Sequence, residues 1–280
     1  MQQFKIVIIG GTSLFGQFWK KYFEEKGQEV IITSRNTKLT SKEAVKMGDI
    51  IIFSVSIRHT VEVIKELIPE IPVSKLIMDF TGIKNEATAE LKKYTSGEVV
   101  ATHPMFGPWI KSLQNQNIAF DPVSPGEKWD FIYNIWKEDG ANLIEMSSKR
   151  HDEIVGIIQS SVHFINLLIG HILKKKGIHP DELVKISTPN SRMQLFILSR
   201  FLNQEASLYT DMQMCNSTYK NEIVPEILDY AQMLFSIIGQ NDSERFENEF
   251  NDLKQFIGQD FPDKALTISS KFDEELKKVL

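Results

Sequence analysis

The stretch "KIVIIGGTSLFGQFWKKYFEEKG", residues 5–27, decides the fold of this 280-residue chain. Within residues 5–10, the four residues 6–9 are apolar without alternation, which is typical of a strand buried on both faces of a parallel sheet. Residues 14–27 carry aromatic side chains at helical spacing and end with a glycine, a common stop for a helix. The sequence therefore predicts a strand, a glycine-rich turn and a helix in immediate succession.

The same alternation of strands and helices continues through the first half of the chain. The expected strands are residues 5–10, 29–33, 49–55, 75–80, 98–102, 117–123 and 142–146. The expected helices between them are residues 14–27, 60–68, 85–94 and 127–138. This alternation indicates an α/β fold, with a doubly wound, mostly parallel sheet of the Rossmann type.

The pattern changes near residue 150, after which helical periodicity replaces strand-like segments. The expected helices are residues 150–176, 181–187, 190–203, 205–239 with a break near Pro225, 242–257 and 262–280. We therefore divide the chain into a Rossmann-type dinucleotide-binding domain, residues 1–150, and an all-helical domain, residues 151–280.

Residues 154–173 form an apolar segment that is long enough to span a bilayer. The segment also contains Gln159, His163, Asn166 and His171, which are costly to place in hydrocarbon. We therefore expect a helix in the interior of a soluble protein. The first three of these polar residues share one helical face, which must meet polar groups or a ligand.

Charge and cysteine content limit the possible partners and compartments. The net charge of -5 argues against nucleic acid or an anionic membrane as the main partner. Cys215 is the single cysteine, so we expect a buried free thiol, no disulfide framework and a cytoplasmic location. The amino-terminal residues do not have the pattern of a signal peptide. We expect no metal site.

The turn "GGTSLFG", residues 10–16, lies where Rossmann folds bind a dinucleotide pyrophosphate on the amides of a helix N-terminus. Serine replaces the middle glycine of the G-x-G-x-x-G pattern. A tight turn needs glycine for structural reasons too, but the strand–turn–helix context favours a cofactor site. The residues of this turn that we expect to bind the cofactor are Gly10, Gly11, Thr12, Ser13, Leu14, Phe15 and Gly16.

The end of the second strand bears on the choice between NAD and NADP. An NAD site usually has an acidic residue there to bind the ribose 2′-hydroxyl. This chain instead has Ser34, Arg35 and Asn36, whose donors and positive charge suit a 2′-phosphate. The alternative is a solvent-exposed arginine. We favour NADP, with NAD possible, and expect Ser54 and Val55 after the third strand to complete the site.

A short-chain dehydrogenase is a competing class, because its glycine pattern faintly matches residues 10–16. That class uses a Tyr-x-x-x-Lys pair, and the spacing occurs at Tyr22/Lys26 and Tyr133/Lys137. Both pairs lie on amphipathic helices outside the expected place. We interpret them as coincidental.

Two further loops follow strands of the predicted sheet: "DFTGIKN", residues 79–85, and "THPMFGP", residues 102–108. Each begins at the carboxyl end of a strand, the edge where doubly wound folds bind ligands. Lys84 and His103 are therefore expected to converge on one crevice. A lone histidine before a proline is most often structural, but two such loops beside a nucleotide loop favour a catalytic base.

These two loops, together with two later segments, resemble the prephenate dehydrogenase family of tyrosine biosynthesis over nearly the whole chain. The later segments are "HDEIVGIIQSSVHFINLLIG", residues 151–170, and "STPNSRMQLFILSRFL", residues 187–202. The pattern is most similar to the dehydrogenase part of bifunctional T-proteins, here without a chorismate mutase domain. The chain departs from the family at Ser13, at Gly82 where a serine is common, and at Val162 where T-proteins carry an arginine.

The resemblance implies oxidative decarboxylation of prephenate with hydride transfer to NAD(P)⁺, and a helical domain that binds substrate and forms a homodimer. The implied catalytic residues are His103 as base and Lys84. The implied substrate-binding residues are Arg192, Thr81, Gln159 and His163. Arogenate is the alternative substrate. A non-catalytic NADP-binding regulatory protein is the alternative from another class, and Gly82 is its one hint.

Overall fold

The computed structural model of the chain describes residues 2–278. Its contacts divide the chain into two compact units, Met1–Gly156 with Ser207–Tyr219, and Ile157–Ala206 with Lys220–Leu280. The single boundary expected near residue 150 lies inside helix α6 (Ser148–Val155), and a short later segment joins the first unit. We describe each unit by itself.

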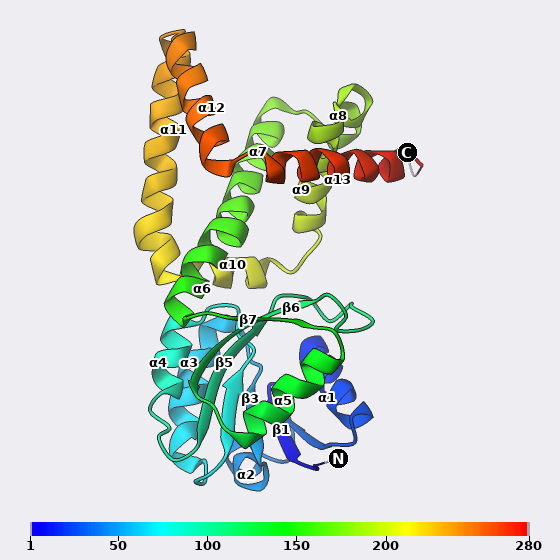
Figure 1. Cartoon of the computed structure of the whole chain (residues 1–280), viewed down its shortest axis with the longest axis vertical. Helices are drawn as coiled ribbons and strands as arrows, with labels where there is room; N and C mark the ends of the chain where they lie inside the picture. Colours follow the sequence, from blue (N-terminus) through cyan, green and yellow to red (C-terminus); the bar gives the residue numbers. More distant parts are fainter. Residues whose placement is uncertain (1, 279–280) are drawn as a thin grey trace. The chain divides into compact units, whose positions relative to one another are not determined.

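The first unit is built on a seven-stranded sheet with the order β2-β1-β3-β4-β5-β6-β7 (Figure 1). Every neighbouring pair is parallel except β5 with β6. The predicted α/β fold with a mostly parallel sheet is confirmed. The strands are β1 (Lys5–Ile9), β2 (Glu29–Thr33), β3 (Ile50–Phe53), β4 (Leu76–Asp79), β5 (Glu98–Pro104), β6 (Asn117–Ser124) and β7 (Asn142–Glu145).

Helices cover both faces of this sheet, which explains the continuous apolar runs of its strands. In β1, Ile6 and Ile8 belong to one core cluster, whereas Val7 and Ile9 belong to the other. The first cluster contains residues of helices α1 and α5, and the second contains residues of α2, α3 and α4. These helices are α1 (Leu14–Glu25), α2 (Ser41–Met47), α3 (Ile57–Leu67), α4 (Asn85–Leu91) and α5 (Glu127–Glu138).

The parallel order brings four loops to one edge of the sheet. Strands β1, β3, β4 and β5 are consecutive neighbours and run in the same direction, so their carboxyl ends lie side by side. The glycine-rich turn follows β1, Lys84 follows β4, and His103 lies near the end of β5. The topology therefore gathers the predicted cofactor turn and both predicted catalytic residues on the same edge.

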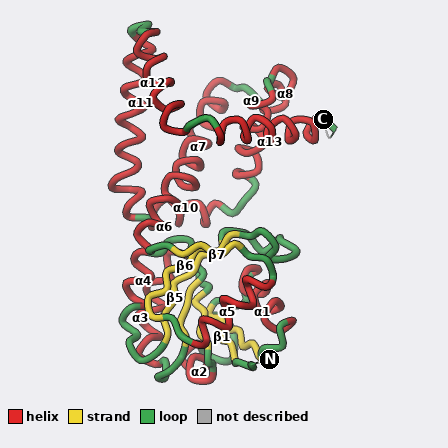
Figure 2. The backbone as a smooth tube through the Cα atoms, in the orientation of Figure 1, coloured by secondary structure: helices red, strands yellow, loops and turns green. Residues whose placement is uncertain are grey.

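The second unit is helical throughout its described residues (Figure 2). A π-helical segment, Gly156–Ser160, precedes α7, and another, Tyr219–Ile223, precedes α11. Pro225 does not break a helix but lies in the first turn of α11. The helices of the unit are α7 (Ser161–Lys176), α8 (Pro180–Ile186), α9 (Pro189–Leu202), α11 (Val224–Gly239), α12 (Ser243–Ile257) and α13 (Asp260–Lys277). Helix α10 (Ala206–Cys215) belongs to the first unit from Ser207 onward, and Cys215, expected to be buried, is partly exposed.

The apolar segment 154–173 is helical, but the prediction that it lies in the interior is wrong for the single chain. Several of its large apolar side chains are exposed in the structure of residues 2–278. The exposed residues of this segment are Ile157, Ile158, Val162, Ile165, Leu167, Leu168 and Ile172. By length and composition, Ser148–Lys176 is one helical stretch that could cross a membrane.

Candidate active site

The turn between β1 and α1 brings backbone atoms very close together. Gly10 adopts a φ of +82°, and a Cβ atom there would lie 2.3 Å from the carbonyl oxygen of Ser54. A Cβ atom on Gly16 would lie 2.5 Å from the Cα atom of Gly11. Only glycine fits at these positions, so helix α1 begins directly against the turn.

Ser13, which replaces the middle glycine of the fingerprint, is the N-cap of α1. Its Oγ accepts a hydrogen bond from the backbone N–H of Gly16 at 3.0 Å. Its φ of -66° is one that any residue adopts, so this position does not need glycine. The serine satisfies one of the amides that would otherwise be unpaired at the helix N-terminus.

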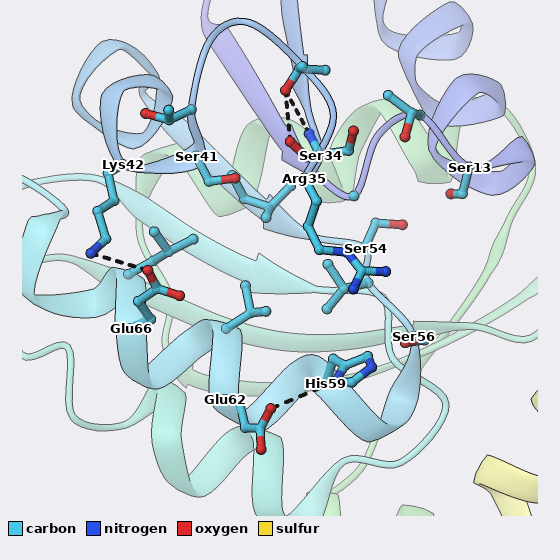
Figure 3. A pocket seen from close by; sticks show the side chains of 18 residues that line it. Ser13, Ser34, Arg35, Ser41, Lys42, Ser54, Ser56, His59, Glu62 and Glu66 are labelled. Atoms are coloured by element: carbon cyan, nitrogen blue, oxygen red, sulfur yellow. Dashed lines mark hydrogen bonds and ion pairs between the residues drawn. The ribbon is translucent and has the colours of Figure 1, made fainter.

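A cavity of about 1000 Å³ opens beside this turn (Figure 3). This is within the usual size of a small-molecule site. The predicted cofactor residues that line it are Gly10, Thr12, Ser13, Ser34, Arg35, Ser54 and Val55. Gly11, Leu14, Phe15, Gly16 and Asn36 are not among its lining residues. Gly11 and Gly16 shape the turn, and Phe15 packs against the rings of Phe18, Phe80 and Phe106.

Helices α2 and α3 supply part of the cavity wall that the sequence analysis missed. The lining residues from these helices and their caps are Thr40, Ser41, Lys42, Ser56, His59, Glu62, Val63, Glu66 and Leu67. The signal for α2 was present, because Thr40 and Glu43 form a reciprocal capping box. The glycine-rich cradle and the cavity together fit a dinucleotide.

Arg35 is the cation of this wall that has no acidic partner in the described part of the chain. Figure 3 shows its side chain extending into the cavity. The two acidic side chains of the wall have their own partners: Glu66 lies 3.1 Å from Lys42, and Glu62 lies 3.7 Å from His59. The guanidinium of Arg35 is therefore available to an anionic ligand.

A chain of three side chains begins at His103. Nδ1 of His103 lies 2.8 Å from Nε2 of His151, and Nδ1 of His151 lies 2.8 Å from Oδ1 of Asp152. His151 and Asp152 are each 2% exposed, whereas His103 is partly exposed. The His-Asp pair opens the segment 151–170, but no role was predicted for either residue.

The backbone of helix α4 holds the carboxylate of Asp152. Its Oδ1 accepts from the N–H of Lys84 and its Oδ2 accepts from the N–H of Asn85, both at 2.8 Å. Asn216, after α10, donates from its side chain to the backbone carbonyl of Asp152 at 3.0 Å. The carboxylate is thus fixed at a helix N-terminus, where negative charge is favoured.

Lys84 lies in the core rather than in an open crevice. Its ammonium donates to Oδ2 of Asp79 and, at 2.5 Å, to the backbone carbonyl of Thr102. Lys84 is 2% exposed and Asp79 is fully buried. Burial lowers the pKa of Lys84 and raises the pKa of Asp79, and the contact between the two charges opposes both shifts.

His103 is held in its neutral form by its surroundings. Burial, then the neighbouring ring of His151, then the charge of Lys84 lower the pKa of His103 well below its usual value. Its second nitrogen is on the side of Gly82: a Cβ atom on Gly82 would lie 3.6 Å from Nε2 of His103 and 3.5 Å from Ile57. A neutral imidazole therefore presents Nε2 between the loops that follow β3 and β4.

Thr81 is the third predicted residue in this region, after His103 and Lys84. It is 4% exposed, and its hydroxyl has no hydrogen-bond partner within residues 2–278. The structure thus brings together His103, Lys84 and Thr81 around the ends of β4 and β5. Gly82 leaves room for a side chain at van der Waals distance from His103.

The other predicted substrate residues lie in the second unit. Arg192, near the start of α9, contacts Asp273 of α13 at 3.1 Å. The ring of His163 stacks on Phe201 with centroids 5.1 Å apart, and burial lowers the pKa of His163. Gln159 lies in the π-helical segment and is partly exposed.

The first Tyr-x-x-x-Lys pair of the chain has a structural role. The hydroxyl of Tyr22 donates to Asp139 at 2.8 Å, and the ammonium of Lys26 lies 2.6 Å from the same carboxylate. Burial and the Asp139 contact raise the pKa of Tyr22. The pair therefore fastens α1 to the end of α5, and a phenol with a raised pKa is poorly suited to the acid–base role of a short-chain dehydrogenase.

Two family models match successive parts of the chain. Residues 22–145 match "Prephenate dehydrogenase, nucleotide-binding domain" and residues 147–252 match "Prephenate dehydrogenase, dimerization domain". The "Probable arogenate/prephenate dehydrogenase" of Methanocaldococcus jannaschii is 30% identical over 300 residues, covering 98% of this chain and 67% of that protein. The T-protein of Haemophilus influenzae is 29% identical over 256 residues, covering 91% of this chain and 67% of that protein.

Solved structures of low sequence identity share the fold. Prephenate dehydrogenase from A. aeolicus, in complex with hydroxyphenyl propionate and NAD⁺, has a TM-score of 0.68 at 14% identity. The alignment covers 91% of this chain and 97% of that one. Synechocystis arogenate dehydrogenase has a TM-score of 0.67 at 18% identity, covering 93% and 99% of the two chains.

Proposed function

The chain belongs to the prephenate dehydrogenase family, a family of NAD(P)-dependent prephenate and arogenate dehydrogenases, and from that premise we propose that it oxidises prephenate with NADP⁺. The observation that carries the proposal is the neutral ring of His103 at the same sheet edge as the cofactor cavity. The products are 4-hydroxyphenylpyruvate and carbon dioxide.

The residues of the cavity fit the dinucleotide. The amides at the start of α1 and the close turn of Gly10 would hold the pyrophosphate. Arg35 and the hydroxyl of Ser34 would hold a 2′-phosphate, which is the basis for preferring NADP. When bound, the nicotinamide accepts a hydride from the substrate.

His103 acts as the general base in this mechanism. Its Nδ1 is engaged by His151, so Nε2 takes the proton of the C4 hydroxyl of prephenate. C4 then releases its hydride, and the C–C bond to the ring carboxylate breaks to give carbon dioxide, leaving that electron pair in the aromatic ring. The proton on His103 returns to the phenolate oxygen, so the enzyme ends in its starting state.

The remaining residues serve charge and orientation. Lys84 lies too deep to touch the substrate, and its positive charge acts on His103 through space. We propose that Arg192 binds the side-chain carboxylate of prephenate in place of Asp273, since a guanidinium binds carboxylates bidentately. Gln159, His163 and Thr81 are proposed to line the substrate site.

We also propose a homodimer formed through the helical unit. Two observations support it: the match of residues 147–252 to a dimerization domain and the exposed apolar faces of that unit. Exposed apolar patches of this extent commonly mark protein interfaces. A cytoplasmic location remains part of the proposal, on the basis of the single cysteine.

The test is an assay of reduced nicotinamide formation with prephenate and with arogenate, each with NAD⁺ and with NADP⁺. We expect the highest kcat/KM for prephenate with NADP⁺. A preference for arogenate would assign the alternative substrate suggested by the name of the M. jannaschii relative. No turnover with either substrate, together with retained NADP⁺ binding, would contradict the enzymatic proposal and favour a regulatory protein.

A further inference from the structure

The buried His151–Asp152 pair lies directly behind His103, at the nitrogen that does not take the proton. Each link of the chain is a hydrogen bond of 2.8 Å. His151 and Asp152 are each 2% exposed, so neither one contacts bulk solvent or is open to a ligand. A charged carboxylate and an imidazole are costly to bury unless every polar atom has a partner.

The carboxylate determines which nitrogen of His151 carries the proton. Both oxygens of Asp152 already accept backbone N–H groups of α4, so the group is fixed as an acceptor. Nδ1 of His151 faces Oδ1 and must therefore be protonated. In the neutral ring the other nitrogen, Nε2, is then an acceptor.

The same argument determines which nitrogen of His103 carries the proton. An acceptor at Nε2 of His151 requires a donor opposite it, so Nδ1 of His103 carries a proton. In neutral His103 the lone pair is then on Nε2, on the side of Gly82. Free imidazole side chains favour the opposite tautomer, with the proton on Nε2. The pair thus holds His103 in the tautomer that can accept a proton at Nε2.

We propose that His151 and Asp152 are positioning residues that select the tautomer of His103 and so make Nε2 its proton acceptor. The part about catalysis rests on the proposed function, whereas the tautomers are a property of the free protein. The arrangement follows the logic of a catalytic triad, in which a carboxylate orients a histidine that touches the reacting group. Here a second histidine stands between them.

The test reads the ring nitrogens directly in the full chain. Protein labelled with ¹⁵N-histidine is examined by long-range ¹H–¹⁵N correlation above the ordinary histidine pKa of about 6.5. Among the six histidines, the signals of His103 are assigned by their loss in His103→Gln. We expect a proton on Nδ1 and a lone pair on Nε2 for His103, and a proton on Nδ1 for His151.

Asp152→Asn is the informative variant, since it keeps the shape and replaces one acceptor by a donor. We expect the proton of His103 to appear on Nε2 in part or all of the molecules, and turnover to fall by about 10²–10⁴-fold. The matched control is Asp121→Asn: Asp121 accepts from the N–H and the hydroxyl of Ser148 and, within the described residues, makes no hydrogen bond to a histidine. It should leave the His103 tautomer unchanged.

His151→Phe is the second test of the His103 tautomer and replaces Asp152→Asn if that variant does not fold. It keeps a ring at this position and removes both nitrogens. His103 should then adopt the tautomer of free imidazole, while NADP⁺ binding stays unchanged. A wild-type His103 that carries its proton on Nε2 would overturn the proposal, as would an unchanged tautomer in both variants. If the wild-type enzyme oxidises neither prephenate nor arogenate, the proposed function fails but the tautomer measurement still decides this inference.

Discussion

Replacing Lys84 with methionine removes the ammonium from a buried ion pair and keeps an unbranched side chain that is only one heavy atom shorter. Asp79 is fully buried, and its carboxylate and the carbonyl of Thr102 both lose the donor that Lys84 supplies. Removing one partner of a buried pair typically costs about 3–5 kcal/mol, because the other charge is left uncompensated. We expect the free energy of unfolding of the first unit to fall by about that amount.

The loss of unfolding free energy in Lys84→Met should grow as the pH rises. Burial already raises the pKa of Asp79, and without Lys84 this pKa must rise further. The folded variant then binds a proton that the unfolded chain releases above its own carboxyl pKa of about 3.9, so unfolding becomes more favourable as the pH increases. The contribution of Asp79 to the stability of the variant is greatest at acid pH. It is lost as the pH rises through the pKa of Asp79 in the folded variant.

Urea unfolding followed by tryptophan fluorescence, from about pH 5 to about pH 8, measures this effect. The four tryptophans all belong to the first unit, so the signal reports that unit alone: they are Trp19, Trp109, Trp129 and Trp136. Lys20→Met is the control, since the Lys20–Glu24 pair is exposed and contributes about 0–1 kcal/mol. Asp79→Asn with Lys84→Met should recover about 0.5–3 kcal/mol of the loss. A loss no larger than that of Lys20→Met, or one independent of pH, would refute the reasoning.

Variants at three further residues test the cofactor turn and the substrate site. Arg35→Ala should weaken NADP⁺ binding by about 1.5–3 kcal/mol and leave NAD⁺ nearly unchanged in equilibrium titrations, and equal losses would contradict a phosphate contact. Ser13→Ala should lower the unfolding free energy by about 0.5–2 kcal/mol and Ser13→Gly by a few tenths, as measured by urea unfolding. If both Ser13 variants lower the unfolding free energy equally, the hydrogen bond that the Ser13 hydroxyl accepts from Gly16 does not contribute to stability. Arg192→Ala should raise the KM for prephenate strongly without changing cofactor binding, and a normal KM would show that its contact with Asp273 is purely structural.

Most of the sheet was predictable because its strands have apolar residues on both faces, which is typical of a parallel sheet covered by helices on both sides. The loops after those strands were predictable as site residues for the same reason, since parallel strands end at one edge. The cap formed by Ser13 was not predicted, although serine is the usual residue at an N-cap. The G-x-G-x-x-G pattern specifies glycine at this position and carries no information about the role of a serine hydroxyl.

The partners of the charged residues required the structure. The sequence places Lys84 at the edge of the sheet but gives no measure of its burial against Asp79. The contact of Arg192 with Asp273 joins residues 81 positions apart, and no local pattern predicts it. His151 was visible in a motif, but its distance to His103 depends on how α6 packs on the sheet. These contacts depend on how elements far apart in the sequence pack together. The periodicity of apolar residues along the chain does not predict that packing.

The central claim, that Nε2 of His103 takes the hydroxyl proton, is tested most directly by the pH dependence of kcat/KM in wild-type enzyme and in His103→Asn. Since burial, His151 and Lys84 lower the pKa of His103, the wild-type acid limb should lie below the ordinary histidine value of about 6.5. His103→Asn should lose about 10²–10⁴-fold in turnover, bind NADP⁺ normally and show no such limb. His179→Asn, the same change at an exposed site, should match the wild type. Normal turnover of His103→Asn, or a limb that persists unchanged in it, would show that the ring is structural and that the base lies elsewhere.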